Sequence, residues 1–375
     1  MHLRRLHLTL LRAHVSVSGV RGIGSFFVYL VVNATLLAAC AGPTTPTQVP
    51  PPVPAPADPP RITCPGAQTA QSLDGGSTAV TFSPPIVVNG QAPVITTCTP
   101  SAGSPFSVGQ KTVTCAATDA LQRTDTCSFL VTVLNPPKLS TTSFLSFGDS
   151  ITAGEDGQNS VASSLSIMSS RFHPSVLFPF AQRYPQELQQ LLLDRYKTQS
   201  PTVSNQGAAG EAASDPAALR RFIGLTSSGR YSVALIMEGT NDLYDRDDRI
   251  VPAAIDGLRQ MIRDAKGKGI RPYLATIPPM NPAACVPVCR GLAWSLVSGF
   301  NDSVRTLATT EGVTLVDVYQ GFGGNFALVG PDGLHPSADG YAKIADLFFS
   351  AIQQTIEISS GVSIRTLHRG TSAAP

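Results

Sequence analysis

Residues 143–150 read SFLSFGDS, a short apolar run that ends in Gly-Asp-Ser. Its length and composition predict a buried strand followed by a tight turn. Similar runs recur downstream, and amphipathic stretches of helical period lie between them. The strand-like runs are 143–147, 202–205, 233–237, 272–277 and 313–316, and the helical stretches are 187–196, 253–266, 292–308 and 338–352. This alternation predicts a parallel sheet covered by helices on both faces, which is a three-layer α/β domain.

Four short polar motifs lie at the ends of these runs or after the last of them. They are 147–150 (Phe-Gly-Asp-Ser), 205–210 (from Asn to Gly), 239–242 (Gly-Thr-Asn-Asp) and 332–335 (Asp-Gly-Leu-His). In parallel sheets, ligands bind outside the carboxyl ends of the strands. We therefore expect the four motifs to meet at one site.

Ser150 and His335 are the candidate nucleophile and base. A serine hydroxyl is a poor nucleophile until a base accepts its proton. Three of the six histidines lie near the N-terminus, His173 lies in a Ser-rich segment, and His368 lies in a polar tail. His335 has Asp332 three residues before it, which can accept from one ring nitrogen while the other faces Ser150. A helix cap beside a surface histidine is the structural alternative for this turn, and the other three motifs argue against it.

In order and spacing, the four motifs resemble the SGNH/GDSL hydrolase superfamily over about residues 143–355. This resemblance implies a flavodoxin-like α/β/α domain, to which we assign residues 141–357, and leaves a polar tail at 358–375. The Gly-x-Ser-x-Gly elbow of another serine-hydrolase plan does not occur in the sequence.

The resemblance also implies the roles of individual residues. The catalytic residues would be Ser150, Asp332 and His335. The oxyanion hole would consist of the backbone N–H of Ser150, the N–H of Gly210 and the side-chain amide of Asn241, since acyl transfer builds negative charge on the substrate oxygen. We expect no metal and no cofactor.

The N-terminus predicts export. Residues 1–39 are first basic and then apolar, with four Arg and no acidic residue, and the apolar run is short for a membrane span. The small residues before Cys40 resemble a bacterial lipobox, which implies lipidation of Cys40 and a membrane-anchored lipoprotein of the cell envelope. An ordinary cleaved signal, giving a secreted protein, and a retained anchor are the alternatives. Pro-rich residues 40–60 predict an extended tether.

Charge and cysteine content exclude some function classes. Beyond residue 39 the chain carries about two excess negative charges, and it lacks the basic groove with interleaved aromatic residues that nucleic-acid binding requires. After Cys40, four cysteines fall in one early segment and two fall together late, at Cys285 and Cys289. Even numbers of cysteines in an exported chain favour disulfides over metal sites.

Residues 61–135 have a different rhythm, with short runs of period two that predict a small antiparallel sandwich. The candidate disulfide cysteines in this segment are Cys64, Cys98, Cys115 and Cys127, and the residues alone leave three pairings open. Runs such as 106–109, 112–115 and 117–119 resemble a hyalin-repeat (HYR) domain, an immunoglobulin-like module of extracellular proteins. The family habit implies the pairs Cys64–Cys127 and Cys98–Cys115. The Gly-Asn usual after the aspartate turn is replaced here by 121–123, Leu-Gln-Arg.

The resemblance implies an ester hydrolase that acts through an acyl-serine intermediate on an extracellular ester, and we favour O-acetylated carbohydrate as substrate. A lipase or arylesterase acting on small or lipid esters is the alternative, as is acyl transfer to another sugar. From a different class of function, a non-catalytic surface protein would use the HYR domain for adhesion and the α/β domain for sugar binding. The insertion at 155–184 and a Cys285–Cys289 bridge are candidate walls of the substrate cleft.

Overall fold

The computed structural model describes residues 57–157, 177–179, 182–244, 249–285 and 291–358. The predicted export signal, the lipidation site Cys40 and nearly all of the tether lie outside these residues, as do Cys289 and most of the insertion after Glu155. Within the described residues, no helix has the length and apolar character needed to cross a membrane.

The C-terminal α/β domain contains a five-stranded parallel sheet in the order β11-β10-β12-β13-β14. Its strands are β10 (Ser143–Gly148), β11 (Thr202–Gly207), β12 (Val233–Met237), β13 (Arg271–Ala275) and β14 (Thr314–Val316). The second strand along the chain, β11, lies at the edge of the sheet beside the first, β10, which is the flavodoxin-like order. The direction of strand addition therefore reverses between β10 and β12, and the crevice at this reversal is where such sheets bind ligands.

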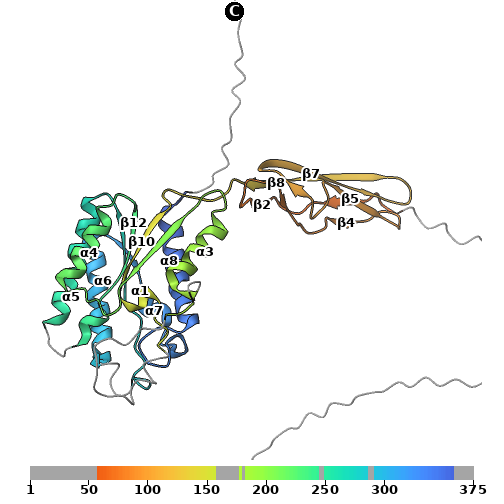
Figure 1. The fold of residues 1–375 in the computed structure, drawn as a ribbon. Coiled ribbons are helices and arrows are strands. Elements are labelled where there is room, and N and C mark those ends of the chain that lie inside the picture. Colours follow the sequence, from red (N-terminus) through yellow and green to blue (C-terminus); the bar gives the residue numbers. More distant parts are fainter. Residues whose placement is uncertain (1–56, 158–176, 180–181, 245–248, 286–290, 359–375) are drawn as a thin grey trace, which may run out of the picture. The chain divides into compact units, whose positions relative to one another are not determined.

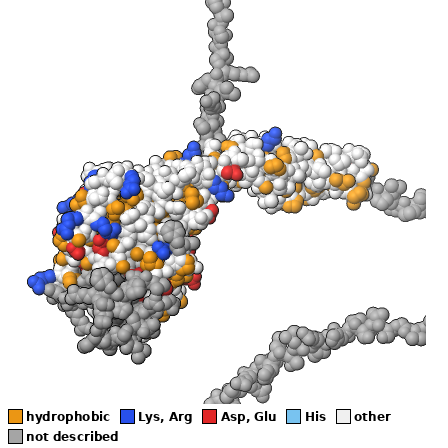
Figure 2. Space-filling model, in the orientation of Figure 1, with side chains coloured by type: hydrophobic (Ala, Val, Ile, Leu, Met, Phe, Trp, Pro, Cys, Tyr) orange, Lys and Arg blue, Asp and Glu red, His pale blue; other side chains and the backbone are white. Residues whose placement is uncertain are grey.

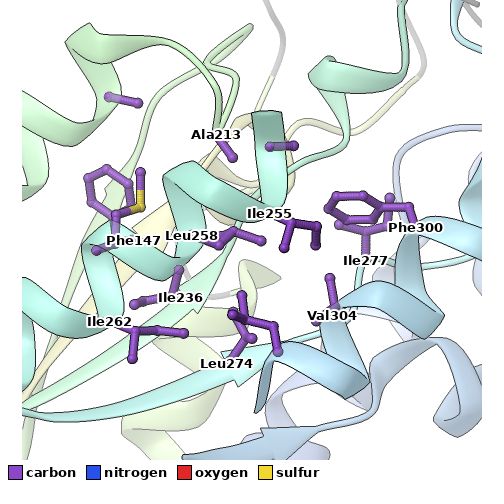
Figure 3. Close-up of a cluster of buried hydrophobic side chains, with 14 of the residues drawn as sticks. Phe147, Ala213, Ile236, Ile255, Leu258, Ile262, Leu274, Ile277, Phe300 and Val304 are labelled. Carbon is purple, nitrogen blue, oxygen red and sulfur yellow. The ribbon is translucent and has the colours of Figure 1, made fainter. Parts of the chain in front are cut away.

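Helices cover both faces of this sheet (Figure 1). The main helices are α3 (Tyr184–Arg195), α4 (Pro216–Thr226), α5 (Ile250–Gly267), α6 (Val297–Glu311) and α8 (Ala338–Ile356). The shorter helices are α1 (Ser150–Ala153), η3 (Asn241–Tyr244), η5 (Trp294–Leu296), α7 (Val318–Phe322) and η6 (Phe326–Leu328). The first core, shown in Figure 3, packs α4, α5 and α6 on one face, and the second packs α3, α7 and α8 on the other. The three-layer α/β/α prediction is confirmed.

The alternation of side chains along β10 explains how one strand serves both cores. Leu145 and Phe147 belong to the core under α4 and α5, whereas Phe144 belongs to the core under α3 and α8. All three are fully buried, because helices cover both faces of the sheet at this central strand. A strand buried on both faces reads as a nearly continuous apolar run, as residues 143–147 do.

Two helices were not among the sequence expectations. Helix α4 begins at Pro216 with Asp215 as its cap, and α7 begins after Asp317, which caps it through the backbone N–H of Gln320. Helix α7 has five residues, too few for a helical period to show, whereas α4 has 11 residues and buries Ala218, Phe222 and Thr226 on one face, a pattern that the sequence analysis overlooked. The strands β9 (Lys138–Leu139) and β15 (Glu357–Ile358) pair with each other, next to the predicted domain limits.

The N-terminal domain is a small β-sandwich. Its strands are β1 (Arg61–Thr63), β2 (Gln68–Gln71), β3 (Thr78–Ala79), β4 (Ile86–Val88), β5 (Ile95–Thr99), β6 (Pro105–Phe106), β7 (Gly109–Thr118) and β8 (Thr124–Leu134). On β8, Phe129, Val131 and Val133 are buried and the residues between them are less so, as the period-two pattern predicts. One pairing differs from the antiparallel expectation, because β2 lies parallel to β8. Parallel neighbours need a crossover connection, which a local pattern does not reveal.

The two disulfides of this domain join Cys64 to Cys127 and Cys98 to Cys115. These are the pairs implied by the hyalin-repeat resemblance. Cys115 is fully buried on β7, directly opposite Cys98 on β5 in the strand register. Disulfides are typical of proteins that fold in an oxidising compartment.

Candidate active site

Ser150 lies at the carboxyl end of β10, as the first residue of helix α1. Asp149 caps this helix, because its carboxylate accepts a hydrogen bond from the backbone N–H of Ile151 at 2.9 Å. The end of β11 packs directly on α1, since a Cβ at Gly207 would come within 2.0 Å of the Ala153 backbone nitrogen. The turn that carries Ser150 is therefore held from both sides.

His335 links Ser150 to Asp332. Its Nε2 lies 2.9 Å from Ser150 Oγ, and its Nδ1 lies 2.6 Å from Asp332 Oδ2. The second oxygen of Asp332 accepts from the backbone N–H groups of Leu334 and His335, both at 3.0 Å. Ser150, Asp332 and His335 are 6%, 8% and 1% exposed. The structure thus brings together the three residues that the sequence analysis assigned to nucleophile, acid and base.

The charge of Asp332 suits the task of orienting His335. Burial opposes its ionisation, but the hydrogen bond to His335, the charge of that ring and two backbone N–H groups outweigh burial and lower the Asp332 pKa below its usual value. Asp332 is therefore ionised at neutral pH. An ionised acceptor holds the proton on Nδ1, which leaves the Nε2 lone pair directed at the Ser150 hydroxyl.

A second carboxylate reaches the same histidine. Glu155 Oε2 lies 3.2 Å from His335 Nε2, and the Glu155 side chain is buried. The hydroxyl of Tyr341 on α8 donates to the Glu155 backbone oxygen at 2.7 Å and fixes this part of the chain. At this distance a carboxylate stabilises the imidazolium that forms when His335 accepts a proton. The sequence analysis did not foresee this contact, because the spacing from Ser150 to Glu155 is not diagnostic.

The other two motifs lie beside Ser150. The backbone N–H of Ala208 donates to Gly148 O at 2.8 Å, which places the loop after β11 against the nucleophile turn. In that loop Gly210 is exposed and has a φ of +77°, a conformation that favours glycine. Asn241 follows β12 and is partly exposed, and its Nδ2 donates to Glu211 O at 2.8 Å. One N–H of this amide is thus used to orient the group, and the other is available to a ligand.

Asp242 connects the third motif to the second. Its two carboxylate oxygens accept from the backbone N–H groups of Ala213 and Ser214, at 2.7 and 2.9 Å. The expectation that Asp149 and Asp242 hold their loops in place agrees with these contacts, because each carboxylate accepts from backbone donors of the loops around the site.

Arg221 on α4 is a further polar group behind the site that the sequence analysis missed. Its guanidinium pairs with the Glu211 carboxylate through Nε, at 2.9 Å, and through Nη2. Nη1 donates to Gln206 O at 2.8 Å, and Nη2 also lies 3.4 Å from Gly148 O. The guanidinium carbon lies 4.0 Å from the centre of the Phe147 ring. One side chain thus ties the ends of β10 and β11 to the loop that bears Gly210.

Two buried acids complete this polar region. Burial and the nearby negative charges of Asp149, Glu211 and Asp242 raise the pKa of Glu238 well above its usual value, which favours its protonated form. Burial also raises the pKa of Asp149 to about 6, although the hydrogen bond from Ile151 opposes this shift. Both shifts favour a lower negative charge behind the candidate oxyanion donors.

The segment after β13 borders the Asp332–His335 turn. The backbone N–H of Asn281 donates to Gly333 O at 2.8 Å, and Cys285 is buried beside the same glycine. The predicted Cys285–Cys289 bridge stays a prediction, because Cys289 lies outside the described residues. Asn281 and Cys285, which lead into the loop expected to border the cleft, contact the turn that carries the candidate base.

Comparison with known families agrees with this geometry. Residues 146–343, more than half of the chain, match the GDSL-like lipase/acylhydrolase family. The chain belongs to this family. It is accordingly an ester-hydrolysing enzyme of the GDSL type. Residues 57–133 match the HYR domain, as the pattern of the first third predicted. No curated protein matches the chain.

Several solved structures are similar to the GDSL domain. A lipase/acylhydrolase from Enterococcus faecalis is 17% identical, with 59% of this chain and 100% of that chain covered and a TM-score of 0.46. A carbohydrate acetylesterase from Sinorhizobium meliloti is 19% identical, covering 57% and 99%, with a TM-score of 0.44. An acetylxylan esterase from Geobacillus stearothermophilus is 20% identical, covering 57% and 94%, with a TM-score of 0.41.

Proposed function

We propose that this GDSL enzyme hydrolyses esters through an acyl-serine intermediate on Ser150, with His335 as base and Asp332 as the acid that orients it. The observation that carries the proposal is the continuous hydrogen-bonded chain from Ser150 Oγ through both ring nitrogens of His335 to Asp332, at 2.9 and 2.6 Å. All three side chains are buried, so their mutual interactions are weakly screened by solvent.

The reaction proceeds in two halves. Ser150 Oγ attacks the ester carbonyl carbon while its proton passes to His335 Nε2. The tetrahedral intermediate collapses, the bond to the alcohol oxygen breaks, and the alcohol leaves with that proton. Water then attacks the acyl-serine, with His335 again accepting the proton, and the carboxylic acid is released as Ser150 regains its hydroxyl.

The negative charge of each intermediate falls on the former carbonyl oxygen. We assign its stabilisation to the backbone N–H groups of Ser150 and Gly210 and to the free N–H of Asn241. The contact of Ala208, two residues before Gly210, with the nucleophile turn and the fixed amide of Asn241 support this assignment. Donors fixed in advance stabilise the charge without reorganising during the reaction.

For the substrate, we propose an O-acetylated extracellular carbohydrate. The two disulfides and the HYR domain support action outside the cytoplasm, and the signal-like N-terminus with Cys40 supports attachment to a membrane through a lipid anchor. A tethered enzyme suits an immobile polymer of the cell surroundings. The HYR domain would act as a spacer or bind a surface ligand. Small or lipid esters are the second candidate, because the family includes lipases.

Hydrolysis of p-nitrophenyl acetate, butyrate and octanoate by the purified chain and its Ser150→Ala variant tests the chemistry. Activity that disappears with Ser150→Ala supports the acyl-serine mechanism, and activity that survives contradicts it. A preference for acetate, with acetate release from acetylated xylan, supports the carbohydrate substrate. A preference for octanoate supports the lipid-ester alternative. Analysis of products in the presence of sugar acceptors separates hydrolysis from acyl transfer.

A further inference from the structure

A groove of about 350 Å³ lies beyond the catalytic turn, at the carboxyl ends of β13 and β14. Three segments line it: the loop after β13, the start of α6 with η5 before it, and α7 with the turn that follows. Its aromatic residues are Trp294, Tyr319 and Phe326. Trp294 is 48% exposed and Phe326 is 41% exposed, so two large apolar rings of the groove lining face solvent. Solvent-exposed aromatic side chains that line a groove are typical of binding sites.

The described lining carries no charge. Besides the aromatic rings, it consists of the exposed side chains of Ser295, Ser298 and Gln320 together with apolar residues such as Met280 and Val297, and none of the described lining residues is charged. A charged ligand would lose hydration there without gaining a counter-charge. A ligand that matches both the rings and the hydroxyl and amide groups is neutral, carries many hydroxyls, and has an apolar face of C–H groups. A sugar ring has these three properties.

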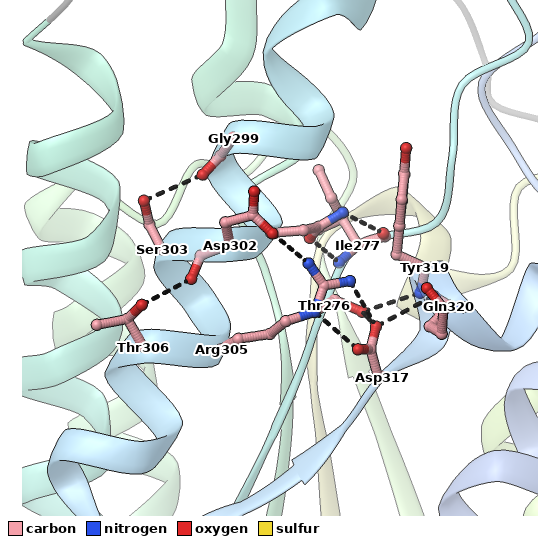
Figure 4. Close-up of polar contacts among 11 residues, drawn as sticks. Thr276, Ile277, Gly299, Asp302, Ser303, Arg305, Thr306, Asp317, Tyr319 and Gln320 are labelled. Carbon is pink, nitrogen blue, oxygen red and sulfur yellow. Dashed lines mark hydrogen bonds and ion pairs between the residues drawn. The ribbon is translucent and has the colours of Figure 1, made fainter.

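Two residues of the groove lining, Tyr319 and Gln320, belong to a hydrogen-bonded network. Figure 4 shows this network, which also includes Thr276, Arg305 and Asp317. Asp317 pairs with Arg305 at 2.7 Å and accepts from Thr276 Oγ1 at 3.0 Å. The backbone N–H of Tyr319 donates to Thr276 Oγ1 at 2.9 Å, and that of Gln320 donates to Asp317 at 3.1 Å. Two residues of the lining are thus fixed before any ligand arrives, which lowers the entropic cost of binding.

The groove shares a wall with the catalytic turn. Met280 and Pro282 line the groove, and Asn281 between them donates its backbone N–H to Gly333 O at 2.8 Å. Gly333 is two residues from His335, whose ring contacts Ser150. The 280–282 segment therefore joins the groove to the turn that carries His335, which is the side from which a polymer bound at Ser150 would reach the groove.

We propose that this groove is a distal glycosyl subsite, which binds an unesterified, neutral sugar unit of the polysaccharide whose ester is cleaved at Ser150. The proposal rests on the proposed function and deepens it, because it names a neutral glycan as the substrate class. A lipid ester would leave the hydroxyl and amide groups of Ser295, Ser298 and Gln320 without a partner, whereas a sugar ring offers hydroxyls to them.

Binding is tested first without catalysis. The Ser150→Ala chain is run by affinity electrophoresis in gels that contain xylan, either acetylated or deacetylated with alkali. Both polymers should retard it, and adding Trp294→Ala should weaken the retardation constant about 3- to 10-fold, as expected for one aromatic contact. Ile223→Ala is the matched control, because Ile223 is also an exposed apolar residue, 38% exposed, on α4. Equal retardation of the Trp294→Ala and Ile223→Ala chains overturns the proposal.

Kinetics on the chain with an intact Ser150 then separate this proposal from the proposed function. Trp294→Ala should raise KM for acetylated xylan about 3- to 10-fold and leave kcat and the hydrolysis of p-nitrophenyl acetate unchanged. If the parent chain hydrolyses no ester, the proposed function fails, while the electrophoresis still decides on the groove. If Trp294→Ala slows p-nitrophenyl octanoate and leaves glycan binding unchanged, the groove is an acyl-chain site and the proposal is wrong.

Discussion

Replacing Arg221 with methionine is expected to lower turnover although Arg221 does not reach the nucleophile. The substitution keeps an unbranched apolar stem next to Phe147 and removes every guanidinium hydrogen bond. Glu211 then loses its ionic partner, and Gln206 loses a hydrogen-bond donor. Because the backbone oxygen of Glu211 fixes the Asn241 amide, disorder in this loop reaches two of the three candidate oxyanion donors.

The structure sets the expected size of the effects on unfolding free energy and on kcat. The Arg221 and Glu211 side chains are 28% and 12% exposed, so this ion pair is partly buried. Losing a surface pair costs at most about 1 kcal/mol in the free energy of unfolding, and breaking a buried pair costs about 3–5 kcal/mol. We expect a loss of about 2 kcal/mol in the free energy of unfolding. Complete loss of one oxyanion donor costs about 10²- to 10³-fold in kcat, so partial misalignment should cost about 10- to 100-fold. KM should change little, because the lost interactions form mainly in the transition state.

The assay is kcat and KM on p-nitrophenyl acetate, together with calorimetric unfolding. Arg195→Met is the matched control, since Arg195 pairs with Glu357 at 2.7 Å, with side chains 30% and 20% exposed, next to the β9–β15 pair and away from the motifs. Arg195→Met should lower stability to a similar extent and leave kcat unchanged. The reasoning is refuted if Arg221→Met keeps full kcat, or if the two variants lose kcat equally.

Three further predictions concern the nucleophile, a buried acid and the sandwich. Ser150→Ala and His335→Ala should each lower kcat by about 10⁴-fold or more while the circular dichroism spectrum stays unchanged, and substantial residual turnover in either variant would contradict their roles. Folding raises the pKa of Asp149 to about 6. The contribution of the protonated acid to the free energy of unfolding is therefore complete below about pH 4 and is lost as the pH rises through 6. The difference in unfolding free energy between Asp149→Asn and the parent should therefore shift by up to about 3 kcal/mol in favour of the variant from pH 4 to pH 8. Urea unfolding at both pH values measures this difference, and an equal difference at both would exclude this titration. Removing the Cys64–Cys127 bridge, which spans 63 residues, should cost the sandwich about 4 kcal/mol by the chain-entropy model, and an unchanged calorimetric transition would show that the bridge is dispensable.

Much of the α/β fold was predictable because its three central strands, β10, β12 and β13, are buried on both faces and form nearly continuous apolar runs. All five strands of the sheet were located from the sequence to within a few residues. On the sandwich strand β8, strict alternation predicted which residues face the core. Helix α7 and the parallel pairing of β2 with β8 were missed, because a five-residue helix has no clear period and the pairing depends on a crossover.

Surface charge was also predictable in outline. The near-neutral composition agrees with Figure 2, where Lys and Arg side chains on the visible face of the described residues are scattered among uncharged and acidic ones.

The sequence by itself determined the chemistry that depends on short-range spacing or on strand direction. Asp332 and His335 are three residues apart, so one turn suffices to join them, and parallel strands place Ser150 and Asn241 at the same edge of the sheet. Only the tertiary structure decided the contacts between residues distant along the chain. It brought Glu155 to His335, and Arg221 to Glu211, because burial and packing select such partners and no local period records them.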